Sequence, residues 1–136
     1  MGQQQLLLIV LGVIIVGFTV LVGVQISEKS FRQHNADLLI DRCLNIAHAA
    51  FSWKAMADPF EGGNASYSGL ENNGFDKLFL GEETESGEFK INKAVGDSLE
   101  IIAVSKRFPE VGVRISVFDD EILRTDVRYD GSISLD

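Results

Sequence analysis

The sequence predicts an α+β protein in which a long N-terminal hydrophobic helix precedes a small antiparallel four-strand β-sheet domain. Residues 1–27 contain no charged side chain. Between residues 89 and 136, apolar and polar residues alternate in short runs, as they do in half-buried strands. We therefore divide the chain into a hydrophobic helix at 1–27, its amphipathic continuation at 28–58, a glycine-rich packed connector at 59–88 and the sheet at 89–136.

The first segment has the length and composition of a membrane span. The 19 residues from Leu6 to Val24 are apolar apart from one threonine and three glycines, and the first charged residue is Glu28. As a helix this stretch would be ~28 Å long, close to the ~30 Å thickness of a bilayer core. It is therefore long enough to cross a membrane.

This helix is compatible with two roles. A simple membrane anchor needs only length, whereas an assembly helix also packs against identical helices. The glycine spacings of five and six do not form a GxxxG face. We expect these glycines to soften the helix locally, because each costs ~1 kcal/mol relative to Ala. The residues expected in the assembly helix are Gln5, Leu8, Gly12, Ile15, Gly17 and Gly23.

Helical periodicity continues beyond the hydrophobic stretch. Polar residues from Asp37 to Ser52 recur every three or four positions, beside an apolar seam. The seam residues are Leu39, Cys43, Ile46, Ala50 and Trp53, widened by Ile40 and Ala47. The Asp58-Pro59 pair is expected to end the helix, because the residue before proline avoids the α region. A helix over about 3–57 would be ~80 Å long, so part of it must contact lipid or other chains.

The connector and the strands follow. Residues 60–88 are rich in glycine and asparagine but contain scattered aromatic and aliphatic residues, which predicts a packed loop. Strands are predicted near 89–95, 99–104, 111–117 and 123–129, with turns at Gly96-Asp97, Pro109 and 119–121. A short tail, 133–135, is expected to extend the sheet edge. In the last strand, Leu123, Thr125, Val127 and Tyr129 are predicted to face the core, opposite Arg124, Asp126, Arg128 and Asp130.

Composition restricts the classes of partner. The chain has 136 residues and a net charge of −8, all of it carried after Ser27. One domain is expected, and nucleic acid is disfavoured because phosphate binding needs clustered Lys and Arg. Cys43 is the one cysteine, so no internal disulfide can form. We expect it to be buried on the apolar face of the helix.

No motif proposes an active site, a cofactor or a metal, and we do not expect an enzyme. His34 and His48 would lie ~21 Å apart on one helix and cannot share a metal ion. The acidic turn at 119–121, with Asp126 or Asp130, offers calcium-like oxygen ligands but lacks EF-hand spacing. It is expected to be a solvated turn. Asn64-Ala65-Ser66 matches the glycosylation sequon, which makes Asn64 a possible modification site.

The order of these segments resembles a type IV pilin or a type II secretion pseudopilin. The resemblance covers the whole chain as architecture and rests mainly on residues 1–57. In that family a prepilin peptidase cuts after a glycine, and a glutamate usually stands fifth in the mature chain. With Met1 as the first mature residue, Gln5 takes that position as a neutral near-isostere, whereas a cut after Gly2 places Leu7 there. The disulfide loop of many pilins has no counterpart here.

The resemblance implies a structural subunit of an extracellular type IV pilus-like filament, which polymerises through its N-terminal helix. Its partners would be identical subunits, the membrane before assembly, and secretion or pilus assembly machinery. It would reside in the inner membrane and then in a filament at the cell surface. The alternative is a single-pass membrane-anchored protein whose β domain binds a partner or a secretion machine, including a minor pseudopilin. The charged face of the last strand is either solvated or a contact between subunits, where complementary charge sets register.

Overall fold

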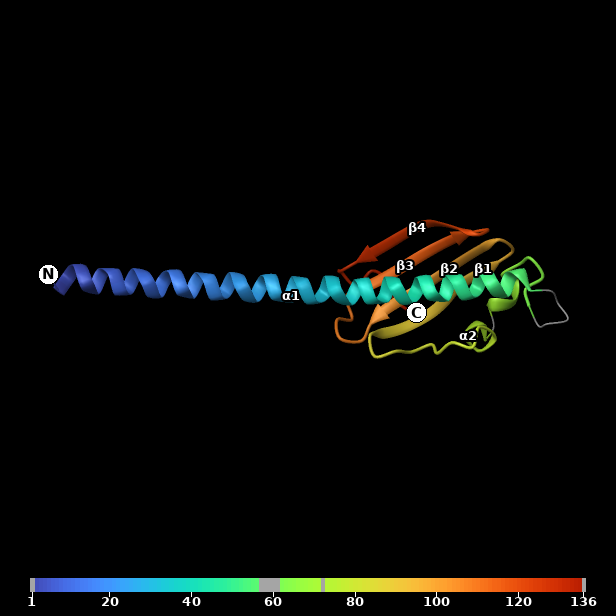
Figure 1. The fold of residues 1–136 in the computed structure, drawn as a ribbon, viewed down its shortest axis with the longest axis horizontal. Helices are drawn as coiled ribbons and strands as arrows, with labels where there is room; N and C mark the ends of the chain where they lie inside the picture. Colours follow the sequence, from blue (N-terminus) through green and yellow to red (C-terminus); the bar gives the residue numbers. More distant parts are fainter. Residues whose placement is uncertain (1, 57–61, 72, 136) are drawn as a thin grey trace. The chain divides into compact units, whose positions relative to one another are not determined.

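The computed structural model describes residues 2–56, 62–71 and 73–135, and it confirms the predicted α+β fold (Figure 1). One long helix is followed by two short helical turns and a four-strand antiparallel sheet. The elements are α1 (Gly2–Ala55), η2 (Ser68–Leu70), α2 (Gly74–Lys77), β1 (Gly87–Val95), β2 (Ser98–Ser105), β3 (Gly112–Phe118) and β4 (Glu121–Arg128). The predicted helix stop at Asp58-Pro59 lies outside the described residues.

The chain divides into two compact units, Met1–Gln33 and His34–Asp136. In the first unit the described residues, 2–33, all belong to α1, and none of them is buried. The buried hydrophobic residues begin at Ala36. The second unit therefore contains the whole hydrophobic core of the described chain, and we call it the body.

The sheet is a meander with the order β1-β2-β3-β4, each strand antiparallel to the next. Gly96 forms the first tight turn with φ +57°, a conformation that glycine adopts without steric cost. Asp119 occupies the left-handed region in the last turn, with φ 56°. Alternation of side chains along each strand gives the sheet one face toward α1 and one outer face.

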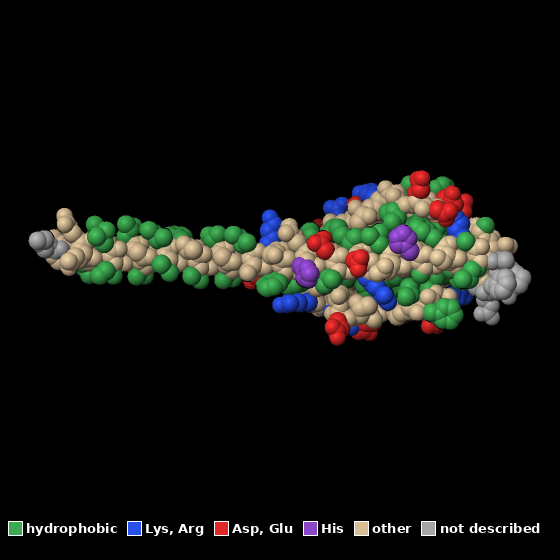
Figure 2. Space-filling view, in the orientation of Figure 1, with side chains coloured by type: hydrophobic (Ala, Val, Ile, Leu, Met, Phe, Trp, Pro, Cys, Tyr) green, Lys and Arg blue, Asp and Glu red, His purple; other side chains and the backbone are tan. Residues whose placement is uncertain are grey.

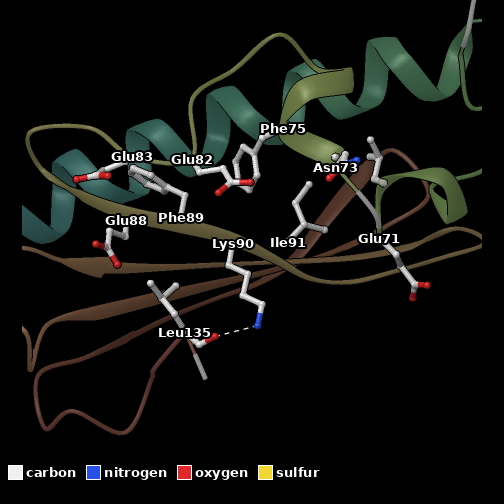
Figure 3. A pocket seen from close by; sticks show the side chains of 12 residues that line it. Glu71, Asn73, Phe75, Glu82, Glu83, Glu88, Phe89, Lys90, Ile91 and Leu135 are labelled. Atoms are coloured by element: carbon white, nitrogen blue, oxygen red, sulfur yellow. Dashed lines mark hydrogen bonds between the residues drawn. The ribbon is translucent and has the colours of Figure 1, made fainter.

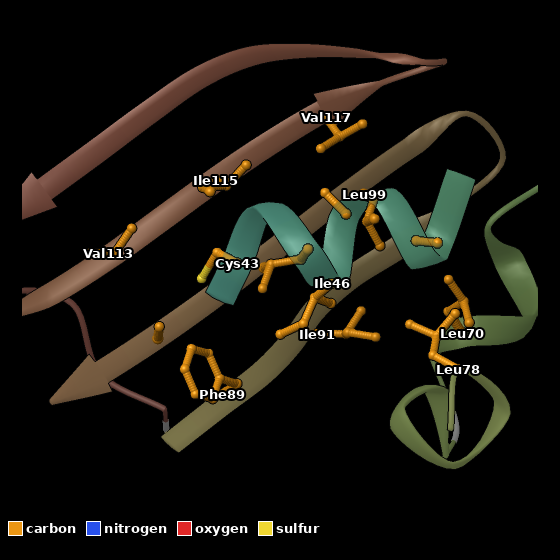
Figure 4. Close-up of a cluster of buried hydrophobic side chains, with 14 of the residues drawn as sticks. Cys43, Ile46, Leu70, Leu78, Phe89, Ile91, Leu99, Val113, Ile115 and Val117 are labelled. Carbon is orange, nitrogen blue, oxygen red and sulfur yellow. The ribbon is translucent and has the colours of Figure 1, made fainter. Parts of the chain in front are cut away.

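The predicted apolar seam of α1 is buried against the inner face of the sheet (Figure 4). Leu39, Cys43 and Ile46 are fully buried. Their neighbours in the core include Phe89, Ile91, Leu99, Ile101, Val113, Ile115 and Val117 from the strands, and Leu70, Phe75 and Leu78 from the connector. Burying a large aliphatic side chain contributes ~1.5–3 kcal/mol, so this layer is the main source of stability in the body.

The connector folds back onto the end of α1. Backbone N–H groups of residues 63–65 donate to carbonyls of residues 53–56, which satisfies acceptors that a helix end leaves open. A Cβ added at Gly63 or Gly69 would lie only 2.6 or 2.7 Å from the Trp53 ring. Glycine at these two positions thus lets the connector pass against the indole, which is 7% exposed.

The last strand departs from its predicted burial. Val127 is half-buried, but Leu123 is 65% and Tyr129 44% exposed, so the prediction that this face enters the core was largely wrong. A helix is ~10 Å wide and strands lie ~4.8 Å apart, so one helix covers two to three strands and leaves β4 uncovered. A bulge between Ser116 and Val117 also shifts the register and displaces Leu123.

The C-terminal segment does not extend the sheet edge, contrary to the prediction. Residues 131–135 belong to no strand and cross the outer face of the sheet. Ile133 is buried over Gly112, where a Cβ would lie 2.7 Å from that of Ile133. At the far end of the crossing, Lys90 Nζ donates to the carbonyl of Leu135 at 2.9 Å.

Because the core begins at Ala36, a chain that lacks residues 1–28 should fold as a soluble, mainly monomeric domain. Circular dichroism should report helix and sheet, and sedimentation should report a monomer. A matched fragment that starts at Asn45 loses Ala36, Leu39 and Cys43 from the core and should fail to fold. Aggregation of the longer fragment under conditions in which the full chain assembles would show that the body lacks a complete core.

Candidate assembly surfaces

Apolar side chains surround the helix over most of the first unit, from Leu6 to Ile26 (Figure 2). Every large hydrophobic side chain from Leu6 to Ile26 is roughly half or more exposed, for example Leu8 at 67% and Ile15 at 57%. Gln5 is also exposed. In the described part of the chain, α1 is the one helix long and apolar enough to cross a membrane. Such a surface suits an apolar environment, because apolar area is unfavourable in water.

The threonine and the three glycines between Leu6 and Val24 are compatible with an apolar environment. Thr19 Oγ1 donates to the carbonyl of Ile15 at 2.8 Å, so its hydroxyl is satisfied inside the helix. A Cβ at Gly12, Gly17 or Gly23 would meet nothing within 4 Å. No contact within the described chain requires these glycines, and each leaves a notch that a neighbouring side chain can fill.

The predicted contact residues of β4 lie mostly together on the outer face. Arg124, Asp126 and Arg128 pair with Ser116, Arg114 and Gly112 of β3, so all three point away from α1. Arg124 Nε lies 2.9 Å from Asp126 Oδ1.

Asp130 is the exception, because it lies beyond the end of β4. Its Oδ1 accepts a hydrogen bond from the Ser132 N–H at 2.9 Å. Hydrogen bonding from Ser132 lowers the pKa of Asp130.

An acidic groove runs beside the free edge of β1 (Figure 3). It has a volume of about 490 Å³, with apolar walls that include Phe75, Phe89 and Ile91. Four glutamates line it against one lysine, Lys90. These glutamates are Glu71, Glu82, Glu83 and Glu88. Glu83 pairs with Lys106, and Glu82 extends between Phe75 and Phe89.

Lys54, near the end of α1, joins the helix to two hairpin turns of the sheet. Its side chain is only 7% exposed, and Nζ lies 2.6 Å from Asp119 Oδ1 and 3.3 Å from Asp97 Oδ1. Asp120 is a more distant partner at 3.7 Å. The hydrogen bond to Asp119 raises the pKa of Lys54, against the lowering effect of burial. This lysine therefore offsets one of the negative charges of the acidic turn.

Tyr67 completes this cluster from the connector. Its ring lies 4.8 Å from Lys54 Nζ, and its hydroxyl donates to the Asp119 carbonyl at 2.5 Å. The Tyr67 N–H donates to the Gly96 carbonyl at 2.7 Å, which fixes the first hairpin turn. Burial raises the pKa of Tyr67 to about 12, with Lys54 opposing the rise.

Sequence reasoning did not identify Lys54. A signal was present, because position 54 follows Ala47 and Ala50 at helical spacing and so lies on the buried seam. A lysine at such a position needs an anionic partner. The two aspartate-containing turns could only be assigned to it once the sheet order was known.

The other residues singled out from the sequence lie at separate, exposed positions. Asn64 of the sequon is exposed, with φ 50°. His34 and His48 are both exposed on α1. Over residues 2–56, 62–71 and 73–135, no three His, Cys, Asp or Glu side chains come close enough to hold a metal ion.

No protein-family model, no curated protein and no solved structure matches this chain. The architecture, a long apolar helix followed by a small antiparallel sheet, is compatible with that of pilin-like proteins.

Substitution of Lys54 by methionine keeps an unbranched chain of similar length but removes its charge. The free energy of unfolding should fall by about 1–3 kcal/mol, as for other hydrogen bonds to charged groups. Lys106→Met, which removes the exposed pair with Glu83, is the matched control and should cost under about 1 kcal/mol. Equal losses in urea titrations of the two variants would contradict the role given to Lys54.

Stability should also fall at alkaline pH. Burial raises the pKa of the Cys43 thiol from 9.0 to about 12, and that of Tyr67 rises from 10.0 to about 12. Between the ordinary and the raised pKa, only the folded state keeps the proton. Unfolding free energy should then drop by about 1.4 kcal/mol per pH unit for each group. Tyr67→Phe should reduce the slope above pH 10, and an unchanged slope would contradict the assignment.

Proposed function

We propose that this protein is the structural subunit of an extracellular type IV pilus-like filament. The observation that carries the proposal is the first unit, whose apolar side chains from Leu6 to Ile26 have no partner within the described chain. The body has a core of its own and an acidic, soluble surface. A chain built this way needs an apolar environment for one unit and water for the other.

Lipid and a bundle of identical helices both provide that environment. Each large aliphatic side chain contributes ~1.5–3 kcal/mol when it is removed from water. The first unit is therefore stable in a membrane or in a helix bundle, but not alone in solution. In this proposal the inner membrane stores the subunits, assembly machinery transfers them, and the bundle of α1 helices forms the filament core with the bodies outside.

A membrane-anchored body is the second candidate. It is favoured by the hydrophobic core within His34–Asp136, which we expect to let the body fold without neighbours. The acidic groove beside β1 would then bind a partner or a secretion machine. In the filament the apolar surface of residues 6–26 packs against the same surface of other copies, whereas in the membrane-anchored protein it stays in lipid.

Ile15→Asp distinguishes them. A carboxylate in a closely packed helix bundle costs several kcal/mol if unpaired, so sedimentable filaments should vanish while the body remains folded. Leu8→Asp should act in the same way. Asn45→Asp, on the exposed polar stripe of α1, is the matched control and should assemble normally. Filaments of normal yield from Ile15→Asp would refute the helix-bundle core.

A further inference from the structure

We propose that neighbouring bodies meet edge to edge, with β4 of one copy against the acidic groove beside β1 of the next. The occupant of the groove is thus a second copy of this chain. The inference rests on the proposed filament function and specifies the contact between bodies. It is carried by the charges of β1 and β4, which are complementary in two adjacent rows of the outer face.

Residues that pair side by side across the four strands form a row. In the first row on the outer face, β1 carries an acidic residue and β4 a basic residue. Glu88 of β1 pairs in register with Val104, Val104 with Gly112, and Gly112 with Arg128 of β4. Glu88 of β1 and Arg128 of β4 therefore lie in one row, and both are exposed. Glu83, which bridges to Glu88, adds a second acidic residue on the outer side of β1. A copy placed alongside in the same row would bring its Glu88 next to Arg128.

The next row has the opposite polarity. Lys90 of β1 pairs with Ile102, Ile102 with Arg114, and Arg114 with Asp126 of β4. The same placement would thus bring Asp126 next to Lys90 of the second copy. A shift by one row would bring Arg128 to Lys90, so the charges of these two rows favour one register. The third row, with Lys93 on β1 and Arg124 on β4, carries like charges and adds nothing to this preference.

The groove is suited to an arginine side chain. Its apolar walls can receive the aliphatic stem, and the carboxylates of Glu82 and Glu88 can receive the guanidinium. Neither glutamate forms an ion pair within the described chain. Arg128 forms no ion pair there either, and its charge contributes to lowering the pKa of the nearby Asp130.

The structure at the two edges of the sheet also determines how neighbouring copies can contact each other. Phe89 N–H donates to the Glu82 carbonyl at 2.8 Å, and Glu83 bridges to Glu88, so the beginning of β1 is already covered. The contact therefore forms through side chains and not by strand addition. Because the two surfaces lie on opposite edges of one sheet, the contact is head-to-tail, and it builds a fibre when the rotation between copies does not close a ring.

Cross-linking of full-length chains in membranes and in sedimented material tests this contact. One tagged copy carries Glu88→Cys and a differently tagged copy carries Arg128→Cys, joined by a short bifunctional maleimide. Cys43 is buried with a raised thiol pKa and should stay unmodified. A product that carries both tags is expected. The matched control replaces Arg128→Cys by Glu121→Cys, which lies ~23 Å away along β4, and should give at least tenfold less product.

Equal yields from the two pairs, or no product from either, would overturn the edge-to-edge contact.

A charge swap gives a second test. Arg128→Glu should weaken the cross-link between the edge pair Lys90→Cys and Asp126→Cys, and adding Glu88→Arg should restore it. Filaments without the cross-link would refute this contact and leave the proposed function intact. The cross-link in membranes without any filament would refute the filament function and retain the contact.

Discussion

Apolar surface on α1 must leave water, and the two parts of the helix meet this requirement in different ways. In the body the surface is a narrow seam, from Ala36 to Trp53, and the sheet covers it. From Leu6 to Ile26 it surrounds the helix, and no described residue covers it. A single helix thus provides the core of a folded domain and, in the first unit, a surface that only lipid or other molecules can cover.

The body also depends on a polar interaction, the ion pairs of Lys54, to hold the helix and the sheet together. The seam fixes α1 over the sheet, but apolar contacts alone do not fix position along the helix axis, because they are non-directional. Lys54 fixes this position, because its ion pairs join the end of α1 to the turns at Asp97 and Asp119. Tyr67 of the connector contacts both Lys54 and the Asp119 carbonyl. Helix, sheet and connector therefore meet at one charged cluster.

Much of the fold could be predicted from periodicity, because the spacing of apolar residues follows directly from helix and strand geometry. This succeeded for the seam through Leu39, Cys43 and Ile46, and for the inner face of β3. It failed at β4, where alternation in the sequence says which residues share a face but not whether a helix covers that face. Leu123 is exposed because one helix is too narrow to cover four strands, and because the bulge leaves Leu123 without a partner on β3.

The surfaces were harder to predict than the core, because they depend on which segments become neighbours. The alternation of charge from Arg124 to Arg128 is visible in the sequence, but its match with Glu88 and Lys90 appears only when the register of all four strands is known. The crossing of the outer face by residues 131–135 has no periodic signal at all. Ile133 is a single apolar residue between polar ones, and its burial over Gly112 results from tertiary packing.

The central claim is that copies of the same helix cover the apolar surface of residues 6–26. Cryo-electron microscopy of membrane-free material released from cells that produce this chain tests it most directly. The account predicts filaments whose core is a bundle of α1 helices, at the ~8–10 Å interaxial distances of packed helices, with the sheets outside. Recovery of the chain only from membranes, with residues 6–26 in lipid and no filament in the released fraction, would contradict it.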